Sequence, residues 1–277
     1  MPKTSTIDNA SLRVRYLALR ATKSLVQRAR AVGRPRAAKR VTFIGGIQRS
    51  GTNMITAALE LSFLTDVFRE SDPRAYESFQ LKPLSTLKEV IAKSPAPFVV
   101  LKALCELQDL GAMLDEFKPA KIIWMVRRYG DMINSHVRFW PGCAKTLGKM
   151  VEDPLSAAWR GRGMSDATRT ILARHHRPDM GDASAVALFW YIRNVLFFEQ
   201  NFDTDPRVIV VRYETLVQNP EPQMHRLFDF LELPLGPRIM KDVFASSIGR
   251  EAAPEIDPEI RALCDGLVQR FEPLIGG

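Results

Sequence analysis

A short segment near the N-terminus combines glycines, hydroxyls and an arginine in an order that can bind phosphate. It reads Gly-Ile-Gln-Arg-Ser-Gly-Thr-Asn over residues 46–53, after the apolar run 41–45 and before a helical pattern with one apolar face. Backbone N–H groups at a helix N-terminus bind anions, glycines let the backbone come close, and the hydroxyls of Ser50 and Thr52 add donors. The segment therefore predicts a phosphate-binding loop. The structural alternative is a tight turn capped by Ser50.

The loop differs from that of nucleoside-triphosphate enzymes in two respects. Gly46 and Gly51 have the spacing of a Walker A loop, but Thr52 stands where its lysine is expected. Two apolar strands run into Arg127 and Arg212 at their ends, where such enzymes place an acidic magnesium ligand. A cationic site without that carboxylate suits an anionic donor held without magnesium. An atypical P-loop phosphotransferase of the kinase type and a non-catalytic nucleotide-binding protein remain alternatives.

Three segments, in this order along the chain, carry a resemblance. They are the loop at 46–53, the strand Ile122-Ile-Trp-Met-Val-Arg127 followed by Ser135, and Val208-Ile-Val-Val-Arg-Tyr-Glu-Thr-Leu-Val217 with an apolar helix after it. Together they resemble sulfotransferases that use 3′-phosphoadenosine 5′-phosphosulfate (PAPS), in the branch with an Arg-Ser-Gly-Thr loop. That branch includes tyrosylprotein and glycan enzymes of the Golgi type and from bacteria. The resemblance implies transfer of a sulfuryl group from PAPS to an acceptor hydroxyl, without a metal.

The resemblance also implies which residues bind the donor. We predict that Arg49 faces the leaving phosphate oxygen, where negative charge grows. Arg127 and Ser135 are expected at the 3′-phosphate, and Tyr213 at the adenine. The full predicted set is Gly46, Arg49, Ser50, Gly51, Thr52, Asn53, Arg127, Ser135, Tyr213 and, in a loop near the C-terminus, Ser247, Gly249 and Arg250.

The acceptor hydroxyl needs a base, and the resemblance points to Glu70. Cytosolic relatives use a histidine shortly after a lysine, but this chain reads Lys102-Ala-Leu-Cys105 at that place. Members of the Arg-Ser-Gly-Thr branch use a glutamate after the second strand, where Glu70 stands, with Asp72 and Glu77 as alternatives. Lys102 is predicted to steady the transferring group or to pair with Glu70. The branch implies a hydroxyl on a glycan or glycolipid as the acceptor.

The elements that must position these residues alternate between apolar strands and helical patterns. Strands are expected at 41–45, 67–70, 98–102, 122–126 and 208–212. This alternation predicts an α/β fold with a P-loop-like parallel sheet flanked by helices, and ligands gather at the carboxyl ends of such strands. Between residues 141 and 180 the strand rhythm lapses, which we interpret as a helical insertion that forms either a lid or plain surface.

The net charge of +8 is concentrated at the N-terminus. Residues 1–40 carry eleven Lys and Arg and one acid, a charge of +10, which leaves −2 for the remainder. We predict a basic helical arm over 1–38 and a sulfotransferase domain over 39–277. The arm contains an amphipathic pattern with Lys23 among its solvated charges. Such a helix either lies on an anionic membrane or an acidic partner, or packs on its own domain. No motif for nucleic acid accompanies the charge.

Other features of the sequence favour a protein without a membrane span, disulfides or a metal. No apolar run approaches the roughly 20 residues of a spanning helix. Cys105, Cys143 and Cys264 form no C-x-x-C pair, and the adjacent His175 and His176 have no second ligand cluster. We therefore expect a cytoplasmic protein, peripheral to a membrane at most. Nothing in the sequence fixes the oligomeric state.

Overall fold

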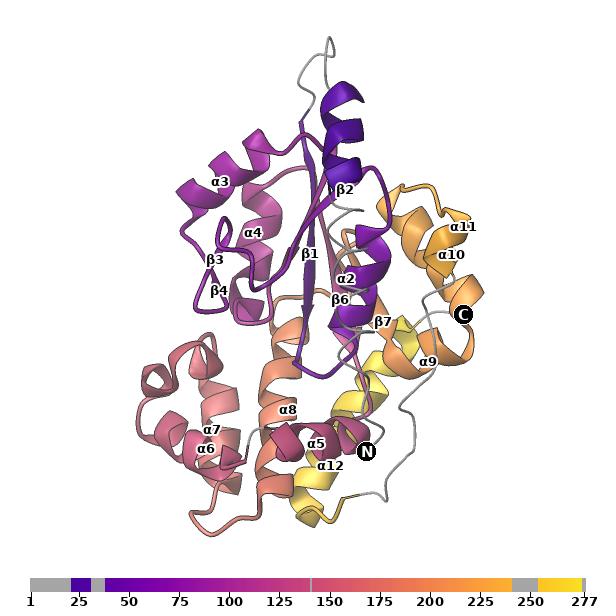
Figure 1. Ribbon diagram of the computed structural model, residues 1–277. Coiled ribbons are helices and arrows are strands. Elements are labelled where there is room, and N and C mark those ends of the chain that lie inside the picture. Colours follow the sequence, from indigo (N-terminus) through magenta and orange to yellow (C-terminus); the bar gives the residue numbers. More distant parts are fainter. Residues whose placement is uncertain (1–20, 31–37, 140, 241–253, 276–277) are drawn as a thin grey trace, which may run out of the picture.

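The computed structural model describes residues 21–30, 38–139, 141–240 and 254–275. At its centre is a five-stranded parallel sheet with the strand order β2-β5-β1-β6-β7 (Figure 1). The strands are β1 Arg40–Gly46, β2 Thr65–Phe68, β5 Phe98–Lys102, β6 Ala120–Val126 and β7 Val208–Arg212. The α/β fold predicted from the alternating pattern is confirmed.

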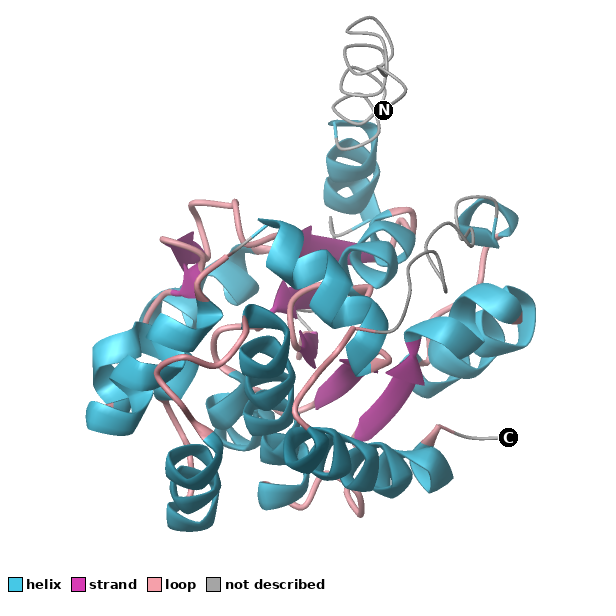
Figure 2. Cartoon of the chain, turned by 90° about the horizontal axis from the view of Figure 1, so that it is seen from below, coloured by secondary structure: helices cyan, strands magenta, loops and turns pink. Residues whose placement is uncertain are grey.

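Helices cover both faces of this sheet, as the view from below shows (Figure 2). The remaining elements are α2 Thr52–Glu60, the hairpin strands β3 Tyr76–Glu77 and β4 Gln80–Leu81, α3 Leu84–Lys93, η1 Leu107–Asp109, α4 Leu110–Glu116, α5 Tyr129–Phe139, α6 Cys143–Glu152, η2 Pro154–Gly161, α7 Asp166–His175, α8 Asp182–Glu199, α9 Tyr213–Gln218, α10 Pro220–Leu231, α11 Pro237–Met240, α12 Pro258–Phe271 and η3 Glu272–Leu274. None of the described helices is long and apolar enough to cross a bilayer.

Alternation along the strands divides the core into two layers. Phe43 faces a layer that includes α4 and α8, whereas the next residue, Ile44, faces a layer that includes α2 and α10. Both side chains are fully buried. The sheet is buried on both faces, as parallel sheets require, and this is why its strands read as continuous apolar runs in the sequence.

The second strand ends earlier than predicted. The sequence suggested residues 67–70, but β2 spans Thr65–Phe68 and its pairing with β5 ends at Phe68. Arg69 lies beyond the ladder, and its guanidinium forms a bidentate pair with Glu60, at 2.5 and 2.7 Å. Glu70 therefore follows the strand by two residues and lies in a turn.

The stretch at 141–180 is helical, as predicted, and it packs firmly on the body. Leu147 and Met150 of α6 and Leu172 of α7 are buried in the layer that contains α8. The helix α8 is itself apolar on all sides, with thirteen buried residues, which is the pattern of a helix surrounded by protein. The insertion is thus a packed helical cover and not a plain surface loop.

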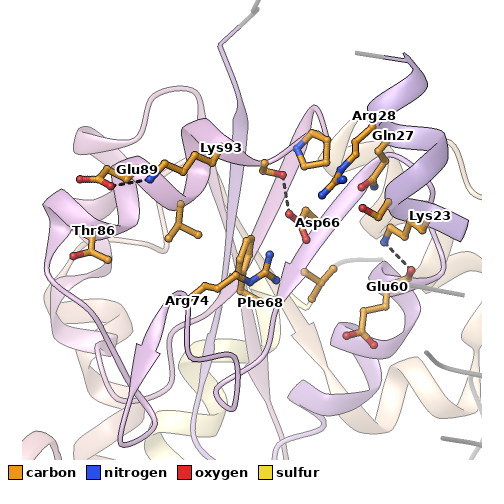
Figure 3. A pocket seen from close by; sticks show the side chains of 15 residues that line it. Lys23, Gln27, Arg28, Glu60, Asp66, Phe68, Arg74, Thr86, Glu89 and Lys93 are labelled. Carbon is orange, nitrogen blue, oxygen red and sulfur yellow. Dashed lines mark hydrogen bonds and ion pairs between the residues drawn. The ribbon is translucent and has the colours of Figure 1, made fainter. Parts of the chain in front are cut away.

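Part of the basic arm lies among the described residues, as a helix over 21–30. Its Lys23, predicted to be solvated, is buried and donates to Glu60 O and Thr65 Oγ1 at 2.8 and 3.0 Å. Gln27 donates to Thr65 O at 2.7 Å. Figure 3 shows both side chains directed from this helix toward the edge of the sheet. The prediction for Lys23 was wrong because the carbonyl of Glu60 at the end of α2 and the hydroxyl of Thr65 on β2 accept from its ammonium group.

Candidate active site

A pocket of ≈ 980 Å³ opens where the parallel strands end. The residues that follow β1, β2, β6 and β7, together with the last residue of β5, all contribute to its wall. Most of the residues predicted from the sequence line it, namely Arg49, Gly51, Thr52, Asn53, Glu70, Lys102, Arg127 and Tyr213. Ligands of open parallel sheets bind at this edge, so the pocket is the candidate active site.

The predicted phosphate-binding loop at residues 46–53 is called the phosphate-type loop below. At two of its positions the backbone has a conformation that only glycine permits. Gly46 has φ 116°, and a Cβ there would lie 2.3 Å from the carbonyl oxygen of Met125. Gly51 has φ 89°, and its Cβ would lie 2.4 Å from the ring of Tyr213. Arg49 is also left-handed, at φ 71°. The loop therefore folds tightly against β6 and brings its backbone close to the pocket.

The start of α2 lacks a side-chain cap within the described chain. Gly51 occupies the capping position, so Ser50 does not cap the helix as the structural alternative required. The hydroxyl of Ser50 is fully buried and has no hydrogen-bond partner among the described residues. Buried hydroxyls are usually bonded, and the first N–H groups of a helix attract anions. These unsatisfied donors beside the pocket fit a bound phosphate.

Two arginines and a serine meet on one side of the loop. Arg49 Nε donates to Ser135 Oγ at 2.7 Å, and Arg127 Nη1 donates to the carbonyl of Arg49 at 3.0 Å. The Arg127 guanidinium also lies over the ring of Tyr213, 4.6 Å from its centroid. Partial burial, then the like charges of Arg127 and Arg138, lower the pKa of Arg49. Because cations here repel one another, an anion would be stabilised between them.

Glu214 holds Arg127 in place, although the sequence assigned it no role. Its carboxylate is 97% buried, lies 4.0 Å from Arg127 Nε and 3.6 Å from Arg212, and accepts the N–H of Arg128 at 3.1 Å. Burial raises the pKa of Glu214. Its position after Arg212 and Tyr213 in the third motif was the signal that could have identified it.

Glu70 and Lys102 form an ion pair at the centre of the pocket. Lys102 Nζ lies 2.5 Å from Glu70 Oε2 and donates to Asn53 Oδ1 at 2.8 Å. The Lys102 side chain is nearly buried, and its backbone N–H donates to the hydroxyl of Tyr76 at 2.7 Å. Lys102 pairs with Glu70, which is one of its two predicted roles, and thereby connects the carboxylate to the phosphate-type loop.

The alternative bases lie elsewhere. Asp72 is paired with Arg74 at 2.6 Å, and Glu77 is exposed on β3. Neither lines the pocket, and Glu70 is its only carboxylate among the described residues. The structure also brings in His136, whose pKa is lowered to about 4 by burial and by Arg160 and Arg49.

The half of the pocket away from the loop combines apolar side chains with the polar ones of His136, Thr146 and Arg160, and the sequence did not predict it. Its wall includes Phe79, Leu104, Cys143, Trp159 and Phe189. These residues come from the β3–β4 hairpin, the segment after β5, the insertion and α8. No periodic pattern or motif joins them in the sequence.

Some predicted features lie outside this pocket. Ser247, Gly249 and Arg250 fall in 241–253, beyond the described residues. The described part of the chain contains no group of three or more His, Cys, Asp or Glu that could hold a metal ion. All three cysteines are buried free thiols.

Comparison with known families decides the class of enzyme. The model of the sulfotransferase family matches residues 75–237, more than half of the chain. The chain belongs to the sulfotransferase family. The match includes Lys102, Arg127, Ser135 and Tyr213, whereas the phosphate-type loop precedes it. No curated protein matches the sequence of this sulfotransferase significantly.

Several solved structures of sulfotransferases are similar to this chain. Sulfotransferase STF9 from Mycobacterium avium is 13% identical, with a TM-score of 0.50 over 92% of this chain and 81% of that chain. A sulfotransferase from Alicyclobacillus acidocaldarius is 18% identical, with a TM-score of 0.48 over 88% and 96%. Mouse sulfotransferase SULT7A1, complexed with PAP, is 13% identical, with a TM-score of 0.46 over 88% of each chain. The likeness to STF9 shows a shared fold.

Proposed function

We propose that this sulfotransferase uses PAPS as its donor and an acceptor hydroxyl as its second substrate, with Glu70 as the base. The observation that carries the proposal is one pocket in which the phosphate-type loop meets the Glu70–Lys102 pair. An enzyme that moves a sulfuryl group from a phosphate to a hydroxyl needs both: a cradle for the anionic donor and a proton acceptor beside it.

The residues of the loop fit an anionic nucleotide. The unpartnered hydroxyl of Ser50 and the uncapped start of α2 would hold the 5′-phosphosulfate. Arg127 and Ser135 would hold the 3′-phosphate, and Tyr213, which lines the pocket, would contact the adenine. When bound, PAPS supplies a sulfuryl group attached to a good phosphate leaving group.

Arg49, Lys102 and Glu70 have separate roles in the proposed reaction. Arg49 presents positive charge where the leaving phosphate becomes more negative, and a preorganised cation stabilises that change. Lys102 fixes the direction of the Glu70 carboxylate through their 2.5 Å contact and ties it to Asn53. Glu70 takes the proton that the acceptor hydroxyl loses.

Family membership decides against the two alternatives that the sequence left open. A phosphotransferase of the kinase type needs carboxylates placed for magnesium. Here the pocket's only carboxylate among the described residues is committed to Lys102. A non-catalytic nucleotide-binding protein would not need the ion pair beside the loop.

The acceptor and the location in the cell remain predictions. A glycan or glycolipid hydroxyl follows from the branch resemblance, and His136, Thr146 and Arg160 offer polar groups in the wall of the pocket away from the loop. Contact with an anionic membrane through the basic arm, from a cytoplasmic location, would use the face of helix 21–30 that leaves Leu25 and Arg28 exposed.

Calorimetry with 3′,5′-phosphorylated adenosine tests the proposal without a turnover assay. We expect binding that a metal chelator does not change, because cations and backbone N–H groups make the site. Adenosine 5′-monophosphate is the matched control, since it lacks only the 3′-phosphate and should bind more weakly. Preference for ATP with magnesium over the 3′-phosphorylated nucleotide would overturn the proposal.

A further inference from the structure

Two acceptors from different segments hold the ammonium group of Lys102. Lys102 Nζ lies 2.5 Å from Glu70 Oε2 and donates to Asn53 Oδ1 at 2.8 Å. An ammonium group has three N–H bonds and turns about its Cε–Nζ bond when a single acceptor holds it. A second acceptor stops this rotation. The two contacts therefore fix the direction of the third N–H of Lys102, which has no acceptor among the described residues.

Asn53 directs its amide oxygen at Lys102. An ammonium group only donates, so the atom that faces it is the oxygen and not the nitrogen of the amide. An anionic phosphate only accepts, so this oxygen offers nothing to a bound donor. Asn53 is exposed in the first turn of α2, where Gly51 takes the capping position. Neither core packing nor helix capping explains an asparagine at this position.

Tyr76 holds the backbone of Lys102 at the end of β5. Its hydroxyl accepts the N–H of Lys102 at 2.7 Å and donates to the carbonyl of Phe68 or of Lys102, at 3.1 or 3.0 Å. Burial raises the pKa of Tyr76 well above its usual range, so the hydroxyl keeps the proton that it donates. The ladder between β2 and β5 ends at Phe68. The hydroxyl thus joins the ends of the two strands where their own hydrogen bonds stop.

The hairpin that carries Tyr76 is anchored through its second strand as well. Tyr76 of β3 is paired with Leu81 of β4, whose N–H donates to Glu106 Oε1 at 2.9 Å. Glu106 follows the end of β5 by four residues, and the Tyr76 side chain is buried. Both strands of the hairpin are therefore tied to the segment that begins at Lys102, which fixes the place of the Tyr76 hydroxyl.

The contact with Lys102 leaves one oxygen of Glu70 for chemistry. Lys102 holds Oε2, whereas Oε1 has no hydrogen-bond partner among the described residues. Glu70 lies in a turn two residues beyond β2, so the sheet does not hold its backbone. A base must stay within hydrogen-bond reach of the proton that it takes, and a small displacement costs a large factor in rate. The support of Glu70 therefore comes from Lys102, and that of Lys102 from Asn53 and Tyr76.

We infer that Asn53 and Tyr76 are positioning residues of the transfer reaction. Both act through Lys102, Asn53 on its ammonium group and Tyr76 on its backbone. They thereby hold the Glu70 carboxylate for the proton of the acceptor hydroxyl. The inference rests on the proposed function and names further residues that the same reaction needs. Loss of either contact should lower turnover and leave donor affinity nearly unchanged.

Release of radiolabelled sulfate from PAPS, with water as the accepting hydroxyl, measures turnover at saturating donor. Asn53→Ala should lower kcat about tenfold, the scale of one hydrogen bond to a charged group, and should change affinity for 3′,5′-phosphorylated adenosine by less than about threefold. Asn53→Asp keeps an oxygen for Lys102 but adds a negative charge beside the donor. It should therefore restore most of kcat and raise the KM for PAPS.

Tyr76→Phe removes only the hydroxyl and keeps the buried ring. Its kcat should also fall about tenfold, and its thermal midpoint should fall because the N–H of Lys102 loses its acceptor. The same two substitutions in a Lys102→Met background separate positioning from general damage. Neither Asn53→Ala nor Tyr76→Phe should lower the rate of Lys102→Met by more than about twofold, because residues that act through one group are not additive.

Each substitution has a control of the same kind elsewhere in the chain. Asn219→Ala removes an exposed asparagine that precedes α10 and makes no side-chain cap. Tyr129→Phe removes a hydroxyl that donates to Asp265 at 2.5 Å, outside the pocket wall. Both variants should keep the kcat of the wild type.

Three outcomes contradict the inference while the proposed function stands. The first is a wild-type kcat in Asn53→Ala, or in a folded Tyr76→Phe, when Glu70→Gln is slow. The second is an undiminished loss of rate in the Lys102→Met background. The third is a higher KM for PAPS at unchanged kcat in Asn53→Ala, which would make Asn53 a ligand of the donor only.

Two further results complete the test. If Tyr76→Phe does not fold, Asn53→Ala decides the inference, because alanine at an exposed position of α2 favours the helix. A wild type that binds 3′,5′-phosphorylated adenosine but releases no sulfate would contradict a base held beside the donor. A protein that does not bind this nucleotide would contradict the proposed function itself.

Discussion

The donor half of the pocket comes mainly from consecutive residues of one loop, whereas the acceptor half is assembled from segments far apart in the chain. Residues 46–53 hold the donor side through backbone geometry, with glycines at two positions where no other residue fits. The other side takes side chains from the hairpin, the insertion and α8. A substitution in a loop that binds through its backbone disturbs the whole loop. A substitution in a wall made of separate side chains alters one contact only. The comparison therefore predicts large, general effects on one side and selective effects on the other.

Glu70 lies between the two halves, and its substitution should have the largest effect. Glu70→Gln keeps a partner for Lys102 but cannot take the proton, so turnover should fall by about 10² to 10⁴. Affinity for 3′,5′-phosphorylated adenosine should stay near that of the wild type. Steady-state kinetics and calorimetry measure the two quantities.

Glu77→Gln is the control for Glu70, because Glu77 is exposed and lies outside the pocket wall. Its turnover should match the wild type. A wild-type rate in Glu70→Gln would assign the proton to another group. Loss of nucleotide binding in that variant would instead make Glu70 an organiser of the donor loop.

Arg127→Ala should have the next largest effect, confined to the donor half. It removes the proposed charged partner of the 3′-phosphate and the contact to the Arg49 carbonyl, so affinity for 3′,5′-phosphorylated adenosine should fall by about 2 kcal/mol or more. Affinity for adenosine 5′-monophosphate should fall much less. Arg128→Ala, at the exposed neighbouring position, should change neither affinity. Equal losses for both nucleotides would show that Arg127 only supports the loop.

Substitution of Glu106 should have a smaller effect, on the pH dependence of stability. Its carboxyl group accepts the N–H of Leu81 on β4 of the hairpin. Burial raises the pKa of Glu106 from its ordinary value of 4.5 to about 7, so the folded protein retains a proton that the unfolded chain releases. Its stabilising contribution is complete below about pH 4.5 and is lost as the pH rises through about 7. The side chain of Glu106→Gln stays neutral and can still accept the N–H of Leu81. The variant should therefore not lose stability as the pH rises through about 7.

Thermal unfolding between pH 5 and pH 8 measures the effect of Glu106. The wild type and Glu106→Gln should have similar midpoints at pH 5. At pH 8 the Gln variant should unfold a few degrees higher, the scale of about 1 kcal/mol in a domain of this size. A lower midpoint of the Gln variant at pH 8 would contradict a proton-binding Glu106.

The N-terminal helix lies outside both halves, and its removal should have the smallest effect on the pocket. Deleting residues 1–31 removes the donors Lys23 and Gln27 from the sheet edge, so stability should fall by about 1 to 2 kcal/mol. Nucleotide affinity should not change, and cosedimentation with anionic vesicles should decrease. Loss of nucleotide binding would make the arm part of the donor site.

The same comparison explains what the sequence could predict. Apolar runs predicted all five parallel strands to within two residues at each end, because strands buried on both faces need continuous apolar side chains. The phosphate-type loop could be recognised in the sequence because its residues are consecutive. Proximity of Glu70 and Lys102 followed from the rule that strand ends share an edge.

The acceptor half could not be predicted for physical reasons. The hairpin that carries Phe79 turns at Ser-Phe, without the Asn or Gly that marks such turns in a sequence. Trp159 and Phe189 look like ordinary apolar residues, and only tertiary packing brings them to one wall. Lys23 is a similar case, because its burial depends on acceptors distant in the chain, the carbonyl of Glu60 and the hydroxyl of Thr65.

Transfer of radiolabelled sulfur from PAPS to a panel of hydroxyl-bearing acceptors, with a chelator present, tests the central claim most directly. We predict that the label moves to at least one acceptor and that Glu70→Gln lowers the turnover number for it. The account would be contradicted if every hydroxyl acceptor left the label on the donor, or if the protein instead transferred labelled phosphate from ATP with magnesium.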